Sequence, residues 1–260
     1  MDFAFTIAGF IVGFIVGLTG VGGGSLMTPI LVLFFGITPA IAVGTDLLYA
    51  AVTKSGGIVV HHHRKTIEWN IVGLLCLGSI PATFAAISVL KYLGEAGKNY
   101  DQLITTTLSI ALILTSLVLI FKKRLLVLGQ NDRFATMRNI HHRYQKHMTV
   151  LSGALIGVLV SFSSVGAGAL GAAILFFLYP RIRSASIVGT DLAHAVPITA
   201  IAGLGHLHLG TVNLTLLGSL LIGSLPGIYL GSHLGSYLPE KIMRPVLASM
   251  LFMIGLRMAI

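Results

Sequence analysis

The amino-acid sequence predicts an all-α, polytopic membrane protein built from two homologous halves. The first observation is composition, because 55% of the 260 residues are hydrophobic and only 10% are charged. So few charges cannot cover the surface of a soluble domain of this length. The second is an internal repeat, in which residues 40–81 align without a gap to residues 185–226 with fifteen of 42 positions identical. An apolar chain made of two copies of one unit is typical of a secondary transporter.

Ten apolar stretches follow one another along the chain, five in each half. They lie near residues 3–20, 24–35, 40–60, 68–90 and 103–121, and near residues 149–165, 168–179, 184–205, 213–236 and 242–260. About 20 apolar residues are needed to cross the hydrocarbon core. Only the stretches at 24–35 and 168–179 fall well below that length. We therefore expect eight to ten membrane segments, including short or re-entrant ones interrupted by glycine, and such segments at matching places indicate a binding site.

A strongly basic segment joins the two halves. Seven Lys or Arg residues lie between positions 122 and 147, and only Asp132 opposes them. We divide the chain into a first membrane repeat (1–121), a basic cytoplasmic linker expected to be a loop (122–148), and a second membrane repeat (149–260). Retention of basic residues on the cytoplasmic side explains the net charge of +9 without nucleic-acid binding, and membrane lipid is an expected partner.

The loop charges also predict how the repeats are oriented. The basic loops at 61–67, 122–147, 180–183 and 237–244 are expected in the cytoplasm. Five passes per half, or three passes plus a re-entrant hairpin, place all of them on one side. Both counts are odd, so the second half is then inverted relative to the first. If only the short segment re-enters, the count is four and the repeat is parallel; we favour the inverted repeat.

A glycine-rich turn precedes the short segment in each half. It reads GLTGVGGGS at residues 17–25 and SFSSVGAGA at residues 161–169. Glycine permits positive φ, and a turn at a helix N-terminus presents N–H groups to an anion. The alternative is tight helix packing through small residues. We assign substrate binding to Gly22, Gly23, Gly24, Ser25, Thr45, Ser164, Gly166, Gly168 and Thr190.

The motif Val-Gly-Thr-Asp-Leu occurs in both halves and carries Asp46 and Asp191. A carboxylate inside an apolar run costs about 2.5–3.5 kcal/mol on insertion scales, and such residues pair, face a cavity or carry protons. Capping of a broken helix is the alternative. Lys54 follows Asp46 by eight residues and is expected either to neutralise it or to extend to the cytoplasmic edge.

The two halves differ at two of these polar positions. Thr199 is the counterpart of Lys54, and His194 is the counterpart of Tyr49. The charge of Lys54 therefore has no equivalent in the second half. We expect coupling or gating from Asp46, Asp191, Lys54, His61, His63, His194, His206 and His208.

Two histidine pairs complete the repeated polar motifs. They are His61-x-His63 and His206-x-His208. No Cys, Glu or further His completes a ligand set, so we expect no metal site. Interfacial hydrogen bonding and proton sensing are the two interpretations left open.

A Gly-Ser-x-Pro motif also occurs twice. It begins at Gly78 and at Gly223, and its prolines are Pro81 and Pro226. Proline inside a membrane helix frees a carbonyl group and bends the helix. We therefore expect an architectural kink at both places.

Taken together, these motifs resemble those of the TauE/SafE family of sulfite and organosulfonate exporters. The resemblance rests on the turns at 20–24 and 165–168, the two Val-Gly-Thr-Asp-Leu motifs and the two Gly-Ser-x-Pro motifs, and it covers nearly the whole chain. It implies an inner-membrane, multi-pass transporter of small sulfur-containing anions or other small organic anions. The second copy departs by having Ala167 in place of Gly23 and Ala173 in place of Pro29.

The expected function is therefore secondary transport of a small anion such as sulfite or a sulfonate, coupled to protons or another ion. No cofactor and no catalytic residue are expected, and a homo-oligomer is compatible with the sequence. An uncoupled anion channel is the first alternative. An intramembrane hydrolase is the second, and it needs Ser55, Ser79 or Ser224 beside a histidine. A primary pump would need another subunit, because no ATP-binding motif is present.

Overall fold

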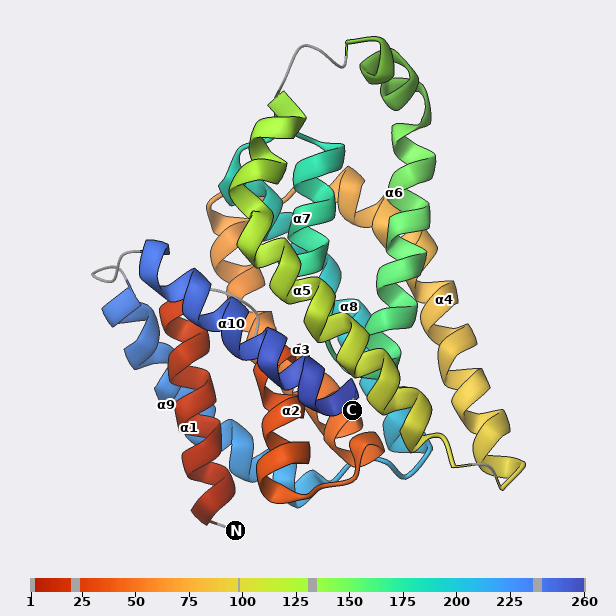
Figure 1. The fold of residues 1–260 in the computed structure, drawn as a ribbon, viewed down its shortest axis with the longest axis vertical. Helices are drawn as coiled ribbons and strands as arrows, with labels where there is room; N and C mark the ends of the chain where they lie inside the picture. The colour runs from red at the N-terminus through yellow and green to blue at the C-terminus, as the bar shows by residue number, and fades with distance from the viewer. Residues whose placement is uncertain (1–2, 20–23, 98, 131–134, 236–239, 260) are drawn as a thin grey trace.

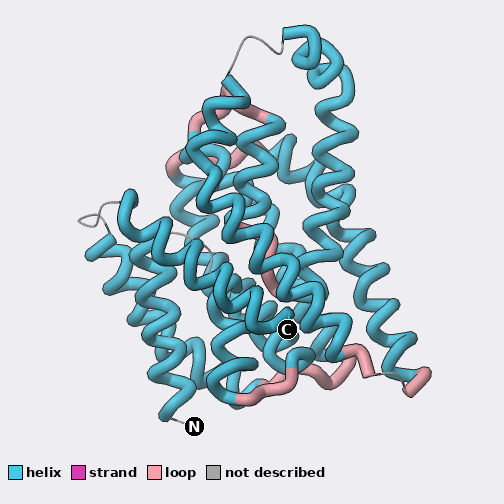
Figure 2. Tube along the Cα trace, in the orientation of Figure 1, coloured by secondary structure: helices cyan, strands magenta, loops and turns pink. Residues whose placement is uncertain are grey.

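The computed structural model describes residues 3–19, 24–97, 99–130, 135–235 and 240–259, and side chains are described outside 19–25, 98, 122–143 and 235–244. The described residues form helices and connecting loops without a strand (Figure 2). The helices are α1 (Phe3–Thr19), α2 (Gly24–Phe35), α3 (Pro39–His63), α4 (Trp69–Glu95), α5 (Asp101–Gln130), α6 (Ala135–Ser163), α7 (Ala169–Leu178), α8 (Ser184–His208), α9 (Leu214–Gly235) and α10 (Glu240–Ala259).

Five stretches of the described chain are long and apolar enough to cross a membrane. They are Trp69–Glu95, Asp101–Phe121, Tyr144–Ser163, Ser184–His208 and Leu214–Leu234. The all-helical, multi-pass class predicted from the sequence is confirmed at this level. Helices α2 and α7 have only 12 and 10 residues, as the two short stretches predicted.

The basic linker differs from the loop that we expected. Helix α5 continues through Gln130 and α6 begins at Ala135, so most of residues 122–148 is helical. Lys, Arg, Leu and Gln favour a helix, and this segment contains no proline. Its charge pattern therefore did not reveal its secondary structure.

Helices of the two repeats pack against each other in matching pairs. Helix α1 lies along α9, and its counterpart α6 lies along α4 (Figure 1). Small residues permit the close approach, since a Cβ added to Gly13 would meet Ser224, and one added to Gly157 would meet Ser79. Helices α3 and α8 pack between these pairs, and α5 packs on α10.

The repeated Gly-Ser-x-Pro motifs lie in these seams. Pro81 and Pro226 lie inside α4 and α9, both of which continue as helices past the proline. A Cβ added to Gly78 would collide with the Val150 backbone of α6, and one added to Gly223 with the Thr6 backbone of α1. The glycines therefore serve close packing between repeats.

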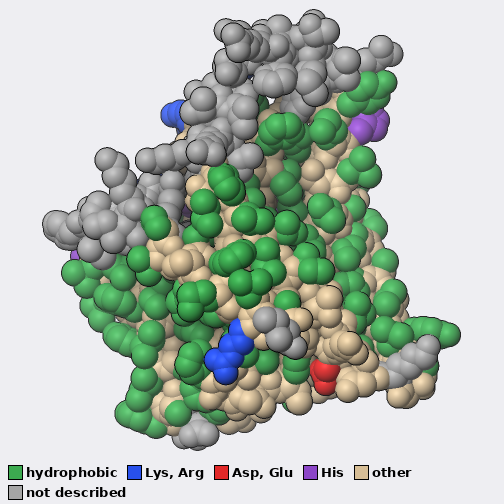
Figure 3. Space-filling view, viewed as in Figure 1, with side chains coloured by type: hydrophobic (Ala, Val, Ile, Leu, Met, Phe, Trp, Pro, Cys, Tyr) green, Lys and Arg blue, Asp and Glu red, His purple; other side chains and the backbone are tan. Residues whose placement is uncertain are grey.

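Polarity is distributed as in a membrane protein, with apolar side chains outside and polar side chains inside. Leu77, Leu151 and Met253 are 66%, 68% and 68% exposed, whereas Asp46 and His194 are fully buried. Figure 3 shows one face on which hydrophobic side chains dominate the described surface and few charged side chains appear. The inside of the helix bundle is thus the place to look for chemistry.

Candidate functional site

Helices α3 and α8, the third helix of each repeat, pack antiparallel. Gly44 near the start of α3 lies against His206 near the end of α8, and Gly189 near the start of α8 lies against His61 near the end of α3. A Cβ on Gly44 would collide with the Thr211 carbonyl oxygen, and one on Gly189 with that of Thr66. Glycine is therefore required at both places for the helices to approach.

The threonines beside these glycines bind the opposite repeat. The Asn213 backbone N–H donates to Thr45 Oγ1 at 3.1 Å, and the Glu68 N–H donates to Thr190 Oγ1 at 3.0 Å. Asn213 and Glu68 immediately precede α9 and α4, where N–H groups lack helical partners. The structure thus places Thr45 and Thr190 at the contact between repeats, where their hydroxyl oxygens accept hydrogen bonds from the N–H groups that precede α9 and α4.

The first histidine of each pair shapes a helix end. His61 Nδ1 lies 2.8 Å from Thr66 Oγ1, and His206 Nδ1 lies 2.8 Å from Thr211 Oγ1. His206 Nε2 is also 3.0 Å from the Ser161 carbonyl oxygen. The Nδ1 contacts bind each histidine to the loop that follows its helix, and the interfacial and proton-sensing interpretations both stay predictions.

The second histidine of each pair lies apart from these contacts. His63 and His208 are exposed at the ends of α3 and α8. In the described part of the chain, no three His, Cys, Asp or Glu side chains gather as metal ligands. In each pair, therefore, the first histidine is buried or half-buried and makes hydrogen bonds, and the second histidine is exposed.

A buried polar cluster lies where α3 and α8 meet the short helices, and it contains Asp46, Lys54 and Asp191. These residues are 0%, 7% and 4% exposed. Lys54 interacts electrostatically with both carboxylates, although no direct ion pair joins them in the described residues. Its Nζ donates at 2.9 Å to the carbonyl oxygen of Ala167, in the glycine-rich turn of the second repeat. Lys54 therefore points into the bundle and does not extend to the membrane edge.

Each aspartate lies beside the short helix of its own repeat. Asp46 Oδ2 accepts a 2.5 Å hydrogen bond from Thr28 on α2. Asp191 Oδ1 lies against Gly171 in the first turn of α7, where an added Cβ would collide with it. Oδ1 of both aspartates is buried without a hydrogen-bond partner among the described residues.

The glycine-rich turn before α7 has the geometry that the sequence predicted for it. Gly166 and Gly168 have φ of 131° and 138°, and Ser164 has φ of 56°. The N–H groups of residues 166–169 have no hydrogen-bond partner in the described structure. Ser164 Oγ is also buried and unpartnered. This turn thus leaves donors unused at the positive end of a helix, beside Lys54.

The first-repeat turn cannot be compared directly. Gly22 and Gly23 lie outside the described residues. Gly24 and Ser25 begin α2, and their side-chain surroundings are not described. The substrate-binding roles of Gly22, Gly23, Gly24 and Ser25 therefore stay predictions.

A serine–histidine contact joins the cluster and was not predicted. His194 Nε2 lies 2.9 Å from Ser79 Oγ, both side chains are fully buried, and His194 Nδ1 has no partner in the described chain. At the equivalent place the Tyr49 hydroxyl is buried near Ser224 and has no hydrogen-bond partner among the described residues. The repeat alignment offered the signal, since it matches His194 with Tyr49 and Ser79 with Ser224. Thr28 gave no such signal, because its counterpart is Ala172.

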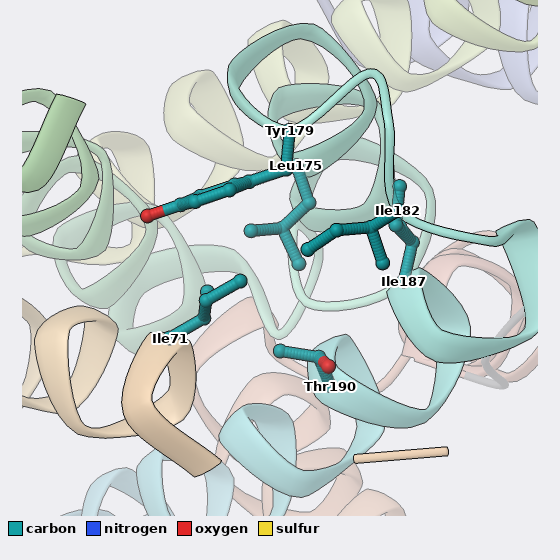
Figure 4. Close-up of a pocket in the computed structure, with 6 residues that line it drawn as sticks. All are labelled: Ile71, Leu175, Tyr179, Ile182, Ile187 and Thr190. Carbon is teal, nitrogen blue, oxygen red and sulfur yellow. The ribbon is translucent and has the colours of Figure 1, made fainter. Parts of the chain in front are cut away.

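A separate, narrow pocket lies near the start of α8 (Figure 4). It is lined by Ile71, Leu175, Tyr179, Ile182, Ile187 and Thr190. The Tyr179 hydroxyl points away from it and lies 2.8 Å from Thr149 Oγ1, while Thr190 Oγ1 accepts from Glu68. With its polar groups engaged elsewhere, this pocket is apolar and suits packing better than anion binding.

Comparison with known proteins agrees with the architecture. The family Sulfite exporter TauE/SafE matches residues 5–258. The chain is 34% identical to the probable membrane transporter protein YjnA of Bacillus subtilis, over 99% of this chain and 100% of that protein. It is 26% identical to the probable membrane transporter protein YdhB of the same organism, over 90% and 91% of the two chains. It is 27% identical to the probable membrane transporter protein MJ0441 of Methanocaldococcus jannaschii, over 97% and 93%.

No solved structure matches the chain significantly. The family match nevertheless spans both repeats, including the buried cluster and the turn before α7. The helices of the described chain that are able to cross a membrane lie within the same span. This multi-pass membrane protein belongs to the TauE/SafE sulfite exporter family.

Proposed function

We propose that this protein is a secondary transporter that moves a small sulfur-containing anion, such as sulfite, a sulfonate or a related organic anion, across the cell inner membrane. Transport is coupled to protons or another ion. The observation that carries the proposal is the position of Lys54, a buried cation beside unused N–H groups at the start of α7. Membership in a family of sulfite exporters supports the substrate class.

The cost of the cluster supports a functional role. Two carboxylates and one ammonium group are buried without a direct ion pair among the described residues. Such groups are expensive inside a membrane protein and usually mark a substrate or ion pathway. Unpartnered buried polar atoms are few in folded proteins. Of the seven such side-chain atoms in the described structure, five belong to Asp46, Tyr49, Ser164, Asp191 and His194.

The proposed architecture is an inverted repeat with the basic segments in the cytoplasm. The antiparallel packing of α3 on α8 and the exchanged pairs α1–α9 and α6–α4 support it. Helices of 12 and 10 residues span only about 18 Å and 15 Å, against about 30 Å of hydrocarbon. Helices α2 and α7 are therefore proposed to re-enter the membrane and to meet near its middle.

The hydrolase alternative has one contact in its favour, which is Ser79 beside His194. A serine nucleophile also needs its base to be oriented by a third group. His194 Nδ1 has no such partner in the described structure. The Ser79–His194 contact is accordingly proposed to position side chains at the cluster, and an enzyme is not proposed.

The direct test is anion binding and uptake by purified protein. Thermal unfolding is measured with sulfite, methanesulfonate, taurine, sulfate, thiosulfate and dicarboxylates, because a bound ligand stabilises the folded state. Uptake into proteoliposomes is then measured for the anion that stabilises most. We expect Lys54→Gln to reduce uptake by at least about 100-fold, equivalent to about 2.7 kcal/mol.

The matched control is Lys91→Gln, which removes a lysine whose side chain is 54% exposed and which pairs with Glu95. It should leave uptake unchanged. Stabilisation by carboxylates alone would contradict the sulfur-anion assignment. Uptake that is insensitive to both pH and sodium gradients would favour the uncoupled channel.

A further inference from the structure

Lys54 is the one basic side chain that interacts with both buried carboxylates in the described structure. The two carboxylates do not depend on it equally. Asp46 has a second source of stabilisation, because Thr28 donates a hydrogen bond to it. Asp191 accepts no hydrogen bond in the described structure, and Lys54 is its only stabilising charge. The ionised form of Asp191 thus depends on Lys54 far more than that of Asp46 does.

An anion at the start of α7 would compete with Asp191 for the same cation. Lys54 already contacts the Ala167 carbonyl in this turn, and Asp191 Oδ1 lies against Gly171 one turn further along. Ser164, in the same turn and near Asp46, adds a buried hydroxyl group that has no hydrogen-bond partner in the described structure. A small anion held by Lys54, the free N–H groups and Ser164 would have the Asp191 carboxylate as a close like charge.

We infer that Asp191 couples anion binding to uptake of one proton, because Lys54 cannot neutralise the anion and the Asp191 carboxylate together. The inference rests on the proposed anion site and names how that site is coupled. When the anion takes Lys54 as its partner, Asp191 accepts a proton from solution at its free oxygen. When the anion leaves, the proton is released and Lys54 again faces a carboxylate. One proton therefore travels with each anion.

The surroundings of Asp191 contain few other titratable groups. Lys54 faces it from α3, where Asp46 and Tyr49 belong to the same cluster. His194 lies on α8 itself and interacts with Lys54. Helix α4 contributes the Ser79 hydroxyl group, while α7 and residues 154–163 of α6 carry no titratable side chain. His194 and Asp46 are thus the groups to be separated experimentally from Asp191, and an Asp46→Asn variant should keep the wild-type pH dependence.

The test measures the affinity of wild-type protein for methanesulfonate and thiosulfate between pH 6 and pH 8. Both probes keep their charge over this range, so the pH dependence belongs to the protein. Uptake of one proton weakens binding by up to about tenfold per pH unit as pH rises. Calorimetry in buffers of different ionisation enthalpy should give about one proton bound per anion.

Variants assign the proton to a residue. Asp191→Asn should bind with an affinity that changes by less than about twofold over the range, whereas His194→Gln and the peripheral control Asp101→Asn should keep the wild-type dependence. Asp101 instead accepts a hydrogen bond from the Ala40 N–H. A pH dependence that survives in Asp191→Asn, or disappears in His194→Gln, overturns the inference.

The wild-type measurements alone decide the question if Asp191→Asn does not fold. Binding without proton uptake overturns the inference and leaves the anion site intact. Binding of neither probe, nor of sulfite, overturns the proposed function and the inference with it.

Discussion

The repeat contacts at the two ends of α3 and α8 are symmetric, whereas the polar cluster near their middle is not. Thr45 bonds the residue before α9 just as Thr190 bonds the residue before α4, and both residues belong to identical motifs. In the cluster, the buried Lys54 and His194 occupy positions whose counterparts in the other repeat are Thr199 and Tyr49. The comparison teaches that identity between the repeats preserves the scaffold, and that differences between them place the charges.

The aspartates belong to both groups. Asp46 and Asp191 are identical in the repeat alignment, yet they have different partners, Thr28 in one half and no hydrogen-bond donor among the described residues in the other. A repeated residue can therefore acquire two roles when its neighbours diverge. Substitutions at matched positions test this separation of scaffold from chemistry.

The largest effect on stability is expected at the glycines of the symmetric contact. Gly44→Ala and Gly189→Ala each place a Cβ against a backbone carbonyl oxygen, which belongs to Thr211 or Thr66. We expect each to destabilise by about 1–3 kcal/mol, because a backbone cannot yield as a flexible side chain does. Thermal unfolding in detergent measures the effect.

The control for these glycines is Gly56→Ala in the same helix α3, since an added Cβ there meets nothing within 4 Å. It should be neutral or stabilising by up to about 1 kcal/mol, as expected for alanine in a helix. A large effect in only one repeat would break the proposed symmetry of the scaffold.

A smaller effect is expected at the threonines. Thr45→Val and Thr190→Val remove the acceptors for the N–H groups of Asn213 and Glu68, so each should destabilise by about 1–2 kcal/mol. Uptake per folded molecule should stay within about threefold, because this hydroxyl group serves the contact between repeats. Thr45→Ser and Thr190→Ser keep the oxygen and should restore stability. If the valine variants lost uptake but kept wild-type stability, the threonines would instead belong to the substrate site.

The smallest effect is expected at the serine of the buried pair. Ser79→Ala removes the hydrogen bond to His194 and should change uptake by less than about threefold. Removing the nucleophile of a serine hydrolase would instead reduce turnover by about 10⁴-fold or more. Uptake and hydrolysis are compared with those of Ser224→Ala, the matching change in the other repeat. A folded Ser79→Ala protein without uptake would make the serine part of the anion site.

Much of the fold was predictable because its signals are local. The stretches at 24–35 and 168–179 became α2 and α7 almost residue for residue, since hydropathy and glycine mark helix ends directly. The positive φ of Gly166 and Gly168 was also foreseeable from the turn. The helical state of residues 122–130 was not, because charge does not distinguish a helix from a loop.

The sequence by itself determined the duplication, the short helices, the buried carboxylates and the family. Only the tertiary structure decided which of these polar residues meet. Lys54 was predicted to neutralise Asp46 or to reach the membrane edge, yet its Nζ contacts Ala167, 113 positions away. Thr45 and Thr190 likewise took partners from the opposite repeat, which are the N–H groups of Asn213 and Glu68. The physical reason is that a repeat alignment compares equivalent residues, whereas antiparallel packing brings the start of one repeat's helix against the end of the other's.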